Sequence, residues 1–169
     1  MDFDLRNPRT LSMTAIMTAL VMGLTLAHIS PTPVGGYIHL GDIAVYFAAF
    51  AFGPWVGMIA GGLGAALADV IGGGAAWAPL SLVAHGLQGL VAGWIVQRAA
   101  TPRRMALAWL AGSLILIVGY FVGEALFYVG PATAALEVPW NGVQEVVGAL
   151  GIAVYLAVRR AYPRLSHAE

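Results

Sequence analysis

Residues 104–128 read RMALAWLAGSLILIVGYFVGEALFY, and no charged side chain stands between Arg104 and Glu124. A helix needs about 20 predominantly apolar residues in a row to cross the hydrocarbon core of a bilayer. This stretch meets that requirement, and it therefore predicts a membrane-spanning helix.

The rest of the chain has the same character. Of its 169 residues, 60% are hydrophobic and 9% are charged, and the mean hydropathy is +0.83. Soluble domains carry about 25% charged residues, so the composition excludes an ordinary soluble protein. We expect one transmembrane domain over residues 1–169. The chain has no cysteine, which excludes disulfides and thiolate sites.

Proline and glycine divide the apolar sequence into six segments. Pro31 and Pro33 follow the first segment, Gly53 and Pro54 separate the second from the third, and a glycine run at 72–74 ends the third. Such residues interrupt helices and mark turns. The predicted fold class is all-α, an integral membrane bundle of six transmembrane helices at about 11–29, 39–52, 54–71, 79–97, 104–128 and 139–158.

The basic residues give the orientation. The chain has no lysine, and its eight basic residues are all arginines in three clusters. With six crossings the clusters fall on one side of the membrane, which the positive-inside rule assigns to the cytoplasm together with both termini. The clusters are Arg6 and Arg9; Arg98, Arg103 and Arg104; and Arg159, Arg160 and Arg164.

Polar side chains inside membrane spans are costly, which makes them functional candidates. In the predicted helices they gather in the half of the bilayer opposite the arginines, although they come from all parts of the chain. Aromatic residues lie at the same level and suit a planar ligand. The expected substrate-binding residues are Tyr37, His39, Asp42, Trp77, His85, Gln88, Glu124, Tyr128, Asn141, Gln144 and Glu145.

Helical spacing groups some of these candidates. Asn141 lies three residues before Gln144 and four before Glu145, and Glu124 lies four before Tyr128. Residues three or four apart share a helix face. The face of the last helix is therefore the strongest candidate for hydrogen bonding to a ligand.

Structural interpretations stay open for other candidates. Asp42 and Asp69 stand near helix ends, where a carboxylate can cap a helix or pair with His39 or His85. Trp77 also fits an aromatic belt at the membrane surface.

Several chemistries are disfavoured by what the sequence lacks. Without lysine there is no phosphate-binding P-loop, and there is no G-x-S-x-G nucleophile motif or H-E-x-x-H zinc motif. We expect no catalytic residue, no cofactor and no metal. Two alternatives remain: a small proton-coupled carrier or channel using Asp42, Asp69 and Glu124, and a membrane enzyme using Asp42 and Asp69 as paired carboxylates.

Ala15 and Ala19 form a pair of small residues four positions apart on the first helix. Such pairs allow close helix packing in lipid, either within the bundle or against a partner subunit.

Four motifs in order carry a family resemblance: GGYIHLGD at 35–42, FGP at 52–54, HGLQGL at 85–90 and PWN at 139–141. Together they resemble the substrate-binding S component of energy-coupling factor (ECF) vitamin transporters. The similarity is to the broad riboflavin-type group, which includes members for hydroxymethylpyrimidine and pyridoxine.

The resemblance implies a multi-pass protein of a prokaryotic plasma membrane that captures a small planar heterocyclic vitamin or precursor. The loop at 30–38 would close over the ligand, and Ala15 and Ala19 would dock against a membrane-embedded coupling subunit. Two ATPase subunits would supply the energy, and the S component would topple in the membrane to deliver its ligand without breaking a bond in it.

Overall fold

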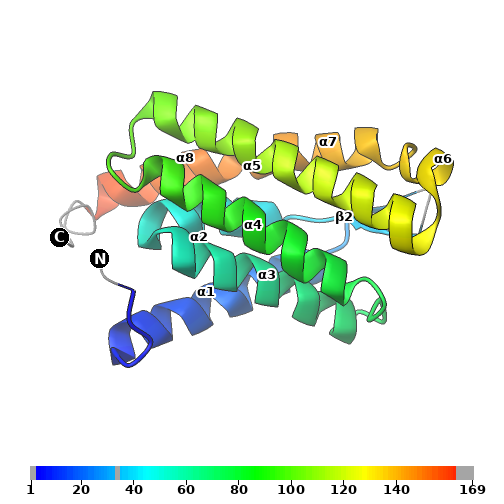
Figure 1. Ribbon diagram of the computed structural model, residues 1–169. Helices are drawn as coiled ribbons and strands as arrows, with labels where there is room; N and C mark the ends of the chain where they lie inside the picture. The colour runs from blue at the N-terminus through cyan, green and yellow to red at the C-terminus, as the bar shows by residue number, and fades with distance from the viewer. Residues whose placement is uncertain (1–2, 33–34, 163–169) are drawn as a thin grey trace.

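The computed structural model describes residues 3–32 and 35–162, so Pro33 and Arg164 lie outside the described residues. Apart from a hairpin of two short strands, the elements are helices (Figure 1). The helices are α1 (Pro8–Leu26), α2 (Gly41–Phe52), α3 (Pro54–Ile71), α4 (Ala78–Val96), α5 (Pro102–Gly123), the π-helix η1 (Glu124–Tyr128), α6 (Pro131–Ala134), α7 (Val138–Gly148) and α8 (Leu150–Ala161). The antiparallel strands are β1 (Ser30–Pro31) and β2 (Tyr37–Ile38).

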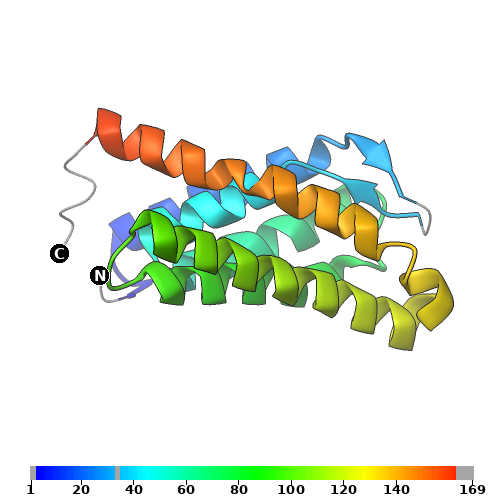
Figure 2. The same ribbon diagram turned by 90° about the horizontal axis from the view of Figure 1, so that it is seen from above.

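The long helices run roughly side by side along one direction (Figures 1 and 2). The start of α1, the connection from α4 to α5 and the end of α8 lie together at one end, which carries the described arginines and is called the arginine end below. The hairpin and α6 lie at the opposite end, called the hairpin end. The expected gathering of arginines at one end of the bundle is therefore present among the described residues.

Two helices begin slightly earlier than the sequence predicts, because each has an N-cap followed by proline. Asn7 accepts a hydrogen bond of 2.9 Å from the backbone N–H of Arg9 at the start of α1. Thr101 accepts one of 3.3 Å from the N–H of Arg104 at the start of α5. A capping side chain with proline at the first helical position is a favourable helix start.

Five helical segments are long and apolar enough to cross a membrane. These segments are Pro8–Leu26, Pro54–Ile71, Ala78–Val96, Pro102–Tyr128 and Pro131–Ala161. The all-α membrane bundle is thus confirmed. The remaining predicted span, at 39–52, corresponds to α2. This helix has 12 residues and a length of about 18 Å, which is shorter than a hydrocarbon core of about 30 Å. Its crossing stays a prediction.

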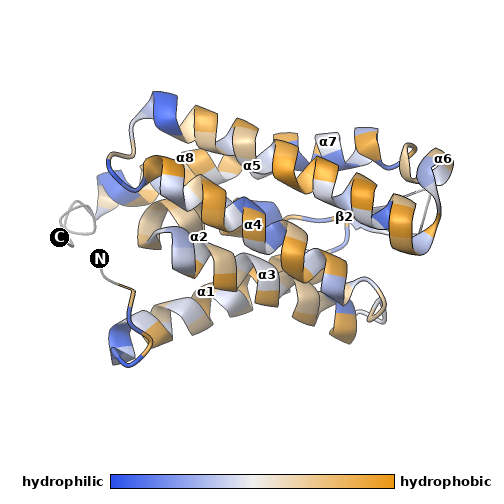
Figure 3. Cartoon of the chain, viewed as in Figure 1, coloured by the Kyte–Doolittle hydropathy of each residue, from blue (hydrophilic) through white to orange (hydrophobic). Residues whose placement is uncertain are grey.

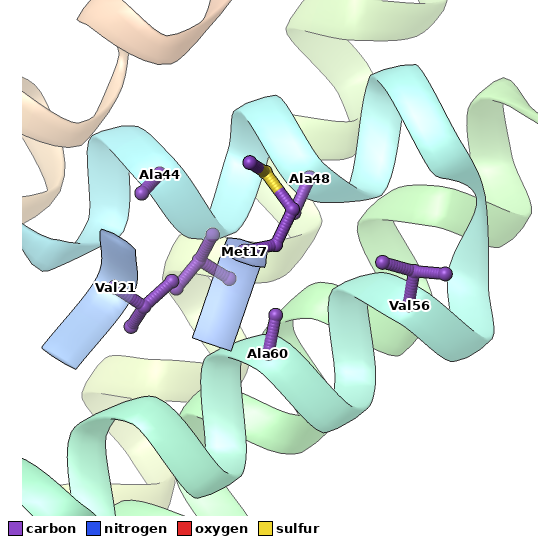
Figure 4. Close-up of a cluster of buried hydrophobic side chains, with 7 residues drawn as sticks. Met17, Val21, Ala44, Ala48, Val56 and Ala60 are labelled. Carbon is purple, nitrogen blue, oxygen red and sulfur yellow. The ribbon is translucent and has the colours of Figure 1, made fainter. Parts of the chain in front are cut away.

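Helix α2 can be short because protein surrounds it. It packs against α1, α3, α4, α7 and α8, and the side chains of Val45, Tyr46, Ala48 and Ala49 are fully buried. Figure 4 shows one side of this core, where α2 meets α1 and α3 through a cluster of small and medium apolar side chains. The cluster consists of Met17, Val21, Ala44, Val45, Ala48, Val56 and Ala60.

The helices consist mainly of apolar residues, with the strongly hydrophilic residues confined to a few places (Figure 3). Large hydrophobic side chains such as Leu67, Leu114 and Phe127 are exposed, with Phe127 at 79%, whereas Asp42 and Glu145 are buried. An exposed apolar surface of this extent is typical of a protein that lipid surrounds.

The predicted last helix, 139–158, is divided into α7 and α8 by a turn at Ala149, where the N–H of Ile152 donates to the Ala149 carbonyl over 3.0 Å. Glycine permits the close approach of this region to α2. A Cβ atom on Gly151 would lie 2.7 Å from the carbonyl oxygen of Ile43, and one on Gly148 would lie 3.0 Å from the Cβ of Asp42.

Candidate functional site

A cavity of ≈ 50 Å³ lies at the hairpin end of the bundle. Its walls come from the hairpin and His39 just after it, from the ends of α3, α4, α5 and α7 that meet there, and from η1. The volume is enough for a few water-sized groups. The lining residues are Thr32, Gly36, Tyr37, His39, Asp69, Trp77, Ser81, Tyr120, Glu124, Glu137, Asn141 and Gln144.

About half of the site residues predicted from sequence line this cavity. They are Tyr37, His39, Trp77, Glu124, Asn141 and Gln144. The predicted list omitted the lining residues Thr32, Gly36, Asp69, Ser81, Tyr120 and Glu137. Helical spacing gave a signal for Ser81 and Tyr120. Ser81 lies four residues after Trp77, and Tyr120 lies four before Glu124, so each shares a helix face with a predicted residue.

A π-helical turn positions Glu124. The N–H of Val129 donates to the Glu124 carbonyl over 2.9 Å, which closes an i to i+5 hydrogen bond at the end of η1. The sequence predicted an unbroken helix here. A π-helical turn widens a helix and is frequent at functional sites. Glu124 lines the cavity and is 3% exposed.

The hairpin contributes Thr32, Gly36 and Tyr37 to the cavity wall and is tied to α3. The N–H of Ile29 donates to the Ile38 carbonyl over 2.8 Å, which pairs the chain on the two sides of the hairpin. The hydroxyl of Tyr37 donates to Oδ1 of Asp69 over 2.8 Å, and its ring stacks on His28 at 3.5 Å. Burial and the Asp69 carboxylate raise the pKa of Tyr37, so its hydroxyl keeps the proton that it donates.

His39 is a neutral member of the cavity wall. Its Nδ1 accepts a hydrogen bond of 3.1 Å from the N–H of Gly41, and an accepting nitrogen carries no proton. Burial lowers the pKa of His39 to about 4. The imidazole is therefore uncharged near neutral pH, with its proton on Nε2.

Trp77 and Tyr128 form a stacked pair beside the cavity. Their rings are 4.5 Å apart with an interplanar angle of 6°, and the Tyr128 hydroxyl donates to the Ala76 carbonyl over 2.7 Å. Trp77 lines the cavity, whereas Tyr128 lies behind it as a support.

Four cavity residues carry buried polar atoms without a hydrogen-bond partner among the described residues. These atoms are Oγ1 of Thr32, Oδ2 of Asp69, Oε2 of Glu124 and Nδ2 of Asn141. Asp69 is 6% exposed and Glu124 is 3% exposed. Buried polar atoms are satisfied in almost all native structures, so these atoms require an explanation.

The remaining predicted residues lie deeper, in a buried polar network. Nδ1 of His85 lies 2.9 Å from Oδ1 of Asp42 and 3.1 Å from Oε1 of Gln88. The side-chain amide of Gln144 donates to Oδ2 of Asp42 over 2.7 Å. These residues connect α2, α4 and α7.

Glu145 is the centre of the lower part of this network. Its carboxylate accepts hydrogen bonds from Nε2 of Gln88 at 2.6 Å and from the hydroxyls of Tyr46 and Ser113, each at 2.7 Å. Its backbone carbonyl accepts one from Nε1 of Trp109 at 2.8 Å. The carboxylate is thus saturated by the protein, unlike those of the cavity.

The network forms the floor of the cavity. Gln144 belongs to both, because it lines the cavity and donates to Asp42. The hydroxyl of Tyr120 lies 2.7 Å from Oγ of Ser81 and 3.4 Å from Nε2 of His85. Toward the arginine end, the described residues next to Tyr46 form an apolar cluster of Ala49, Phe50, Ala92, Val96, Met105 and Ala108.

Asp42 and Asp69, the carboxylates shared by the proton-carrier and membrane-enzyme alternatives, are bound to different partners in the protein. Asp42 is held by His85 and Gln144, while Asp69 receives Tyr37. Within residues 3–32 and 35–162, no group of three or more histidine or acidic side chains is arranged to hold a metal ion.

The predicted docking pair lies on the outer face of α1. Ala15, Ala19 and Gly23 are all exposed and lie four residues apart. A Cβ atom on Gly23 would meet nothing within 4 Å. The face is therefore a smooth stripe of small residues that does not pack within the bundle.

Sequence comparisons place the chain among transport proteins. Residues 6–161 match the family described as ECF-type riboflavin transporter, S component. The thiamine precursor transporter HmpT of Lactococcus lactis subsp. cremoris (strain MG1363) is 36% identical over 148 residues, covering 86% of this chain and 84% of HmpT. An uncharacterized protein in the gap 3′ region of Pyrococcus woesei is 38% identical over 138 residues, covering 80% of this chain and 92% of that protein.

Proposed function

The chain belongs to the family of ECF-type riboflavin transporter S components, and we propose that it captures a small planar heterocyclic vitamin or vitamin precursor in the cavity at the hairpin end. The observation that carries this proposal is a cavity lined by polar and aromatic side chains in a bundle with an apolar exterior. Small-molecule sites typically combine flat apolar walls with a few placed polar groups.

The cavity is lined by side chains suited to the flat faces of a heterocycle and by others suited to its polar edge. Tyr37, Trp77 and Tyr120 provide rings for its faces, while Asn141 and Gln144 provide amides for its edge. Asp42, His85, Gln88 and Glu145 act from below, because they hold the floor in place through the buried network. Tyr128 acts through Trp77 by stacking on it.

The hairpin controls access to the ligand. It contributes to the cavity wall and is fastened to α3 by the bond between Tyr37 and Asp69. Ligand entry and release then require that this bond opens. The two-residue strands make few backbone hydrogen bonds, so opening costs little compared with moving a helix.

The orientation and the partners follow from the arginine end and from α1. We place the arginine end in the cytoplasm of a prokaryotic cell, with the cavity facing outward across the plasma membrane. Ala15, Ala19 and Gly23 give a flat face for a membrane-embedded coupling subunit. Two ATPase subunits supply the energy, which agrees with a chain that has no lysine for a P-loop.

The similarity to HmpT favours a pyrimidine precursor of thiamine among the candidate ligands. Pyridoxine is the other single-ring candidate.

Mass spectrometry of the small molecules that co-purify with the protein tests the proposal directly. It is followed by calorimetric titration with hydroxymethylpyrimidine, pyridoxine, thiamine and riboflavin. We expect one of them to bind with a Kd well below micromolar. If none binds more tightly than about −8 kcal/mol, which corresponds to a micromolar Kd, vitamin capture is wrong.

A further inference from the structure

The cavity has an acidic lining without a basic counterpart. Its lining residues include the carboxylic acids Asp69, Glu124 and Glu137 and contain neither arginine nor lysine. The whole chain has no lysine, and its arginines at positions 6, 9, 98, 103, 104, 159, 160 and 164 belong to other segments. His39 does not offset the carboxylates, because its Nδ1 is an acceptor.

The unpartnered atoms specify what a ligand must offer. Oδ2 of Asp69 and Oε2 of Glu124 are buried hydrogen-bond acceptors without a donor among the described residues, and Nδ2 of Asn141 is a donor without an acceptor. A buried carboxylate oxygen that lacks a donor is unfavourable. A ligand with donors at two positions and an acceptor at a third would satisfy these three atoms, and the unpartnered Thr32 hydroxyl can pair with either kind of group.

The contrast with Glu145 shows that this arrangement is local to the cavity. The Glu145 carboxylate receives three protein donors, whereas Oε2 of Glu124, a residue that lines the cavity, is buried without a protein donor. Asp69 uses Oδ1 for the Tyr37 hydroxyl and leaves Oδ2 unused. The Asp69 carboxylate can therefore bind the hairpin through one oxygen and a ligand through the other.

We propose that the cavity selects nitrogen heterocycles that carry an exocyclic amino group, and that Asp69 and Glu124 accept hydrogen bonds from the N–H donors of this group. Asn141 donates to an acceptor on the same ligand. Phosphorylated forms are rejected, because a phosphate would face carboxylates in a poorly solvated space. This inference rests on the proposed function, since it names the chemical class of the vitamin precursor bound there.

Three matched compounds test the selectivity on the unmodified protein. They are 4-amino-5-hydroxymethyl-2-methylpyrimidine, its analogue with a carbonyl in place of the 4-amino group, and its phosphate monoester. Binding is followed through the fluorescence of Trp77, which lines the cavity, and by calorimetry. We expect the amino compound to bind at least tenfold more tightly than the carbonyl analogue and at least a hundredfold more tightly than the phosphate.

Charge-removing variants then test the residues. Asp69→Asn keeps an oxygen for Tyr37 and Glu124→Gln keeps the side-chain shape, yet each should weaken binding of the amino compound at least tenfold and of the carbonyl analogue less than threefold. The matched control is Asp4→Asn, an exposed carboxylate at the arginine end that accepts from the N–H of Arg6. The melting temperature of ligand-free Glu124→Gln should not fall, because no protein donor satisfies its free oxygen.

The possible failures are distinguishable. Equal or tighter binding of the carbonyl analogue, the phosphate or riboflavin would overturn the inference and leave vitamin capture intact. Unchanged affinity of the amino compound in both variants would overturn the roles of Asp69 and Glu124. Absence of binding by every heterocycle tested would overturn the inference together with the proposed function.

Discussion

The hydroxyl of Tyr37 lies 2.8 Å from Oδ1 of Asp69, so a charge-assisted hydrogen bond joins β2 to the last turn of α3. The bond spans 32 positions of sequence. It makes the closed position of the hairpin dependent on a residue that also lines the cavity. Under the proposed function, opening of the hairpin and binding of the ligand would be linked through this one carboxylate.

Tyr37→Phe removes this bond while keeping the aromatic ring. We expect the ligand dissociation rate to rise roughly tenfold, because a hydrogen bond to a charged acceptor contributes about 1.5–3 kcal/mol when buried and less for a half-buried tyrosine. Stopped-flow fluorescence measures the rate. Tyr162→Phe, at the exposed end of α8, is the control, and an unchanged rate in Tyr37→Phe would show that the bond does not retain the ligand.

Glu145→Ala should destabilise the protein strongly. It removes the acceptor shared by Gln88, Tyr46 and Ser113 and leaves the Tyr46 hydroxyl only its longer contacts to the Trp109 carbonyl and Ser113, at a cost of about 3–5 kcal/mol for a broken buried network. We expect the melting temperature to fall by about 10 °C, as measured by differential scanning fluorimetry in detergent. The melting temperature of Glu145→Gln should fall less. Equal melting temperatures for the wild type and Glu145→Ala would contradict a structural role for the network.

Gly151→Ala tests the close contact of α8 with α2. The added Cβ would lie 2.7 Å from the Ile43 carbonyl oxygen and 2.8 Å from the Cβ of Tyr46, and we expect a loss of about 1–3 kcal/mol from overpacking. Gly142→Ala on the neighbouring helix α7 is the matched control, because its Cβ would meet nothing within 4 Å. That variant should be neutral or slightly stabilising. The same melting temperature for both variants would show that the contact has no energetic weight.

Ala15→Trp and Ala19→Trp test the docking face. A large ring on the small-residue stripe should abolish co-purification with the coupling and ATPase subunits, and ligand affinity should stay within about twofold because the face lies outside the cavity. Leu114→Trp, on an exposed position of α5, controls for a tryptophan in lipid. Retention of the partners by both alanine variants would mean that the coupling subunit docks elsewhere.

His39 predicts a pH dependence of stability. Burial lowers its pKa to about 4 in the folded protein, against about 6.5 when unfolded. Between these values the unfolded chain binds more protons, so folding stability falls as the pH falls from about 6.5 toward 4, by up to about 3 kcal/mol. Melting curves between pH 7.5 and 5 should show a steeper loss in the wild type than in His39→Gln, and parallel slopes would contradict the prediction.

The bundle was predictable because its signals are local. Membrane spans depend on runs of apolar residues, and helix ends depend on proline, glycine and capping residues next to them. Even so, the predicted helix at 104–128 ends in a π-helical turn at Glu124. The predicted helix at 139–158 is broken at Ala149, where the glycines of α7 and α8 meet α2.

From the sequence, the candidate site was predictable only as a set of polar residues at the same depth in the membrane. Depth along the helices grouped Asp42 and Glu145 with Glu124 and Asn141. Depth does not say which of these side chains find partners inside the protein. Asp42 and Glu145 do, through Gln144 and Gln88.

Composition and the order of residues along the chain were sufficient for the membrane bundle, for the placing of the arginines together and for the list of polar candidates. These properties follow from transfer of individual segments between water and lipid, which requires no knowledge of their neighbours. The tertiary structure decided that Tyr37 reaches Asp69, that Glu145 is saturated and that Glu124 is not. A hydrogen bond depends on the distance between groups far apart in sequence, and only the packing of the helices determines that distance.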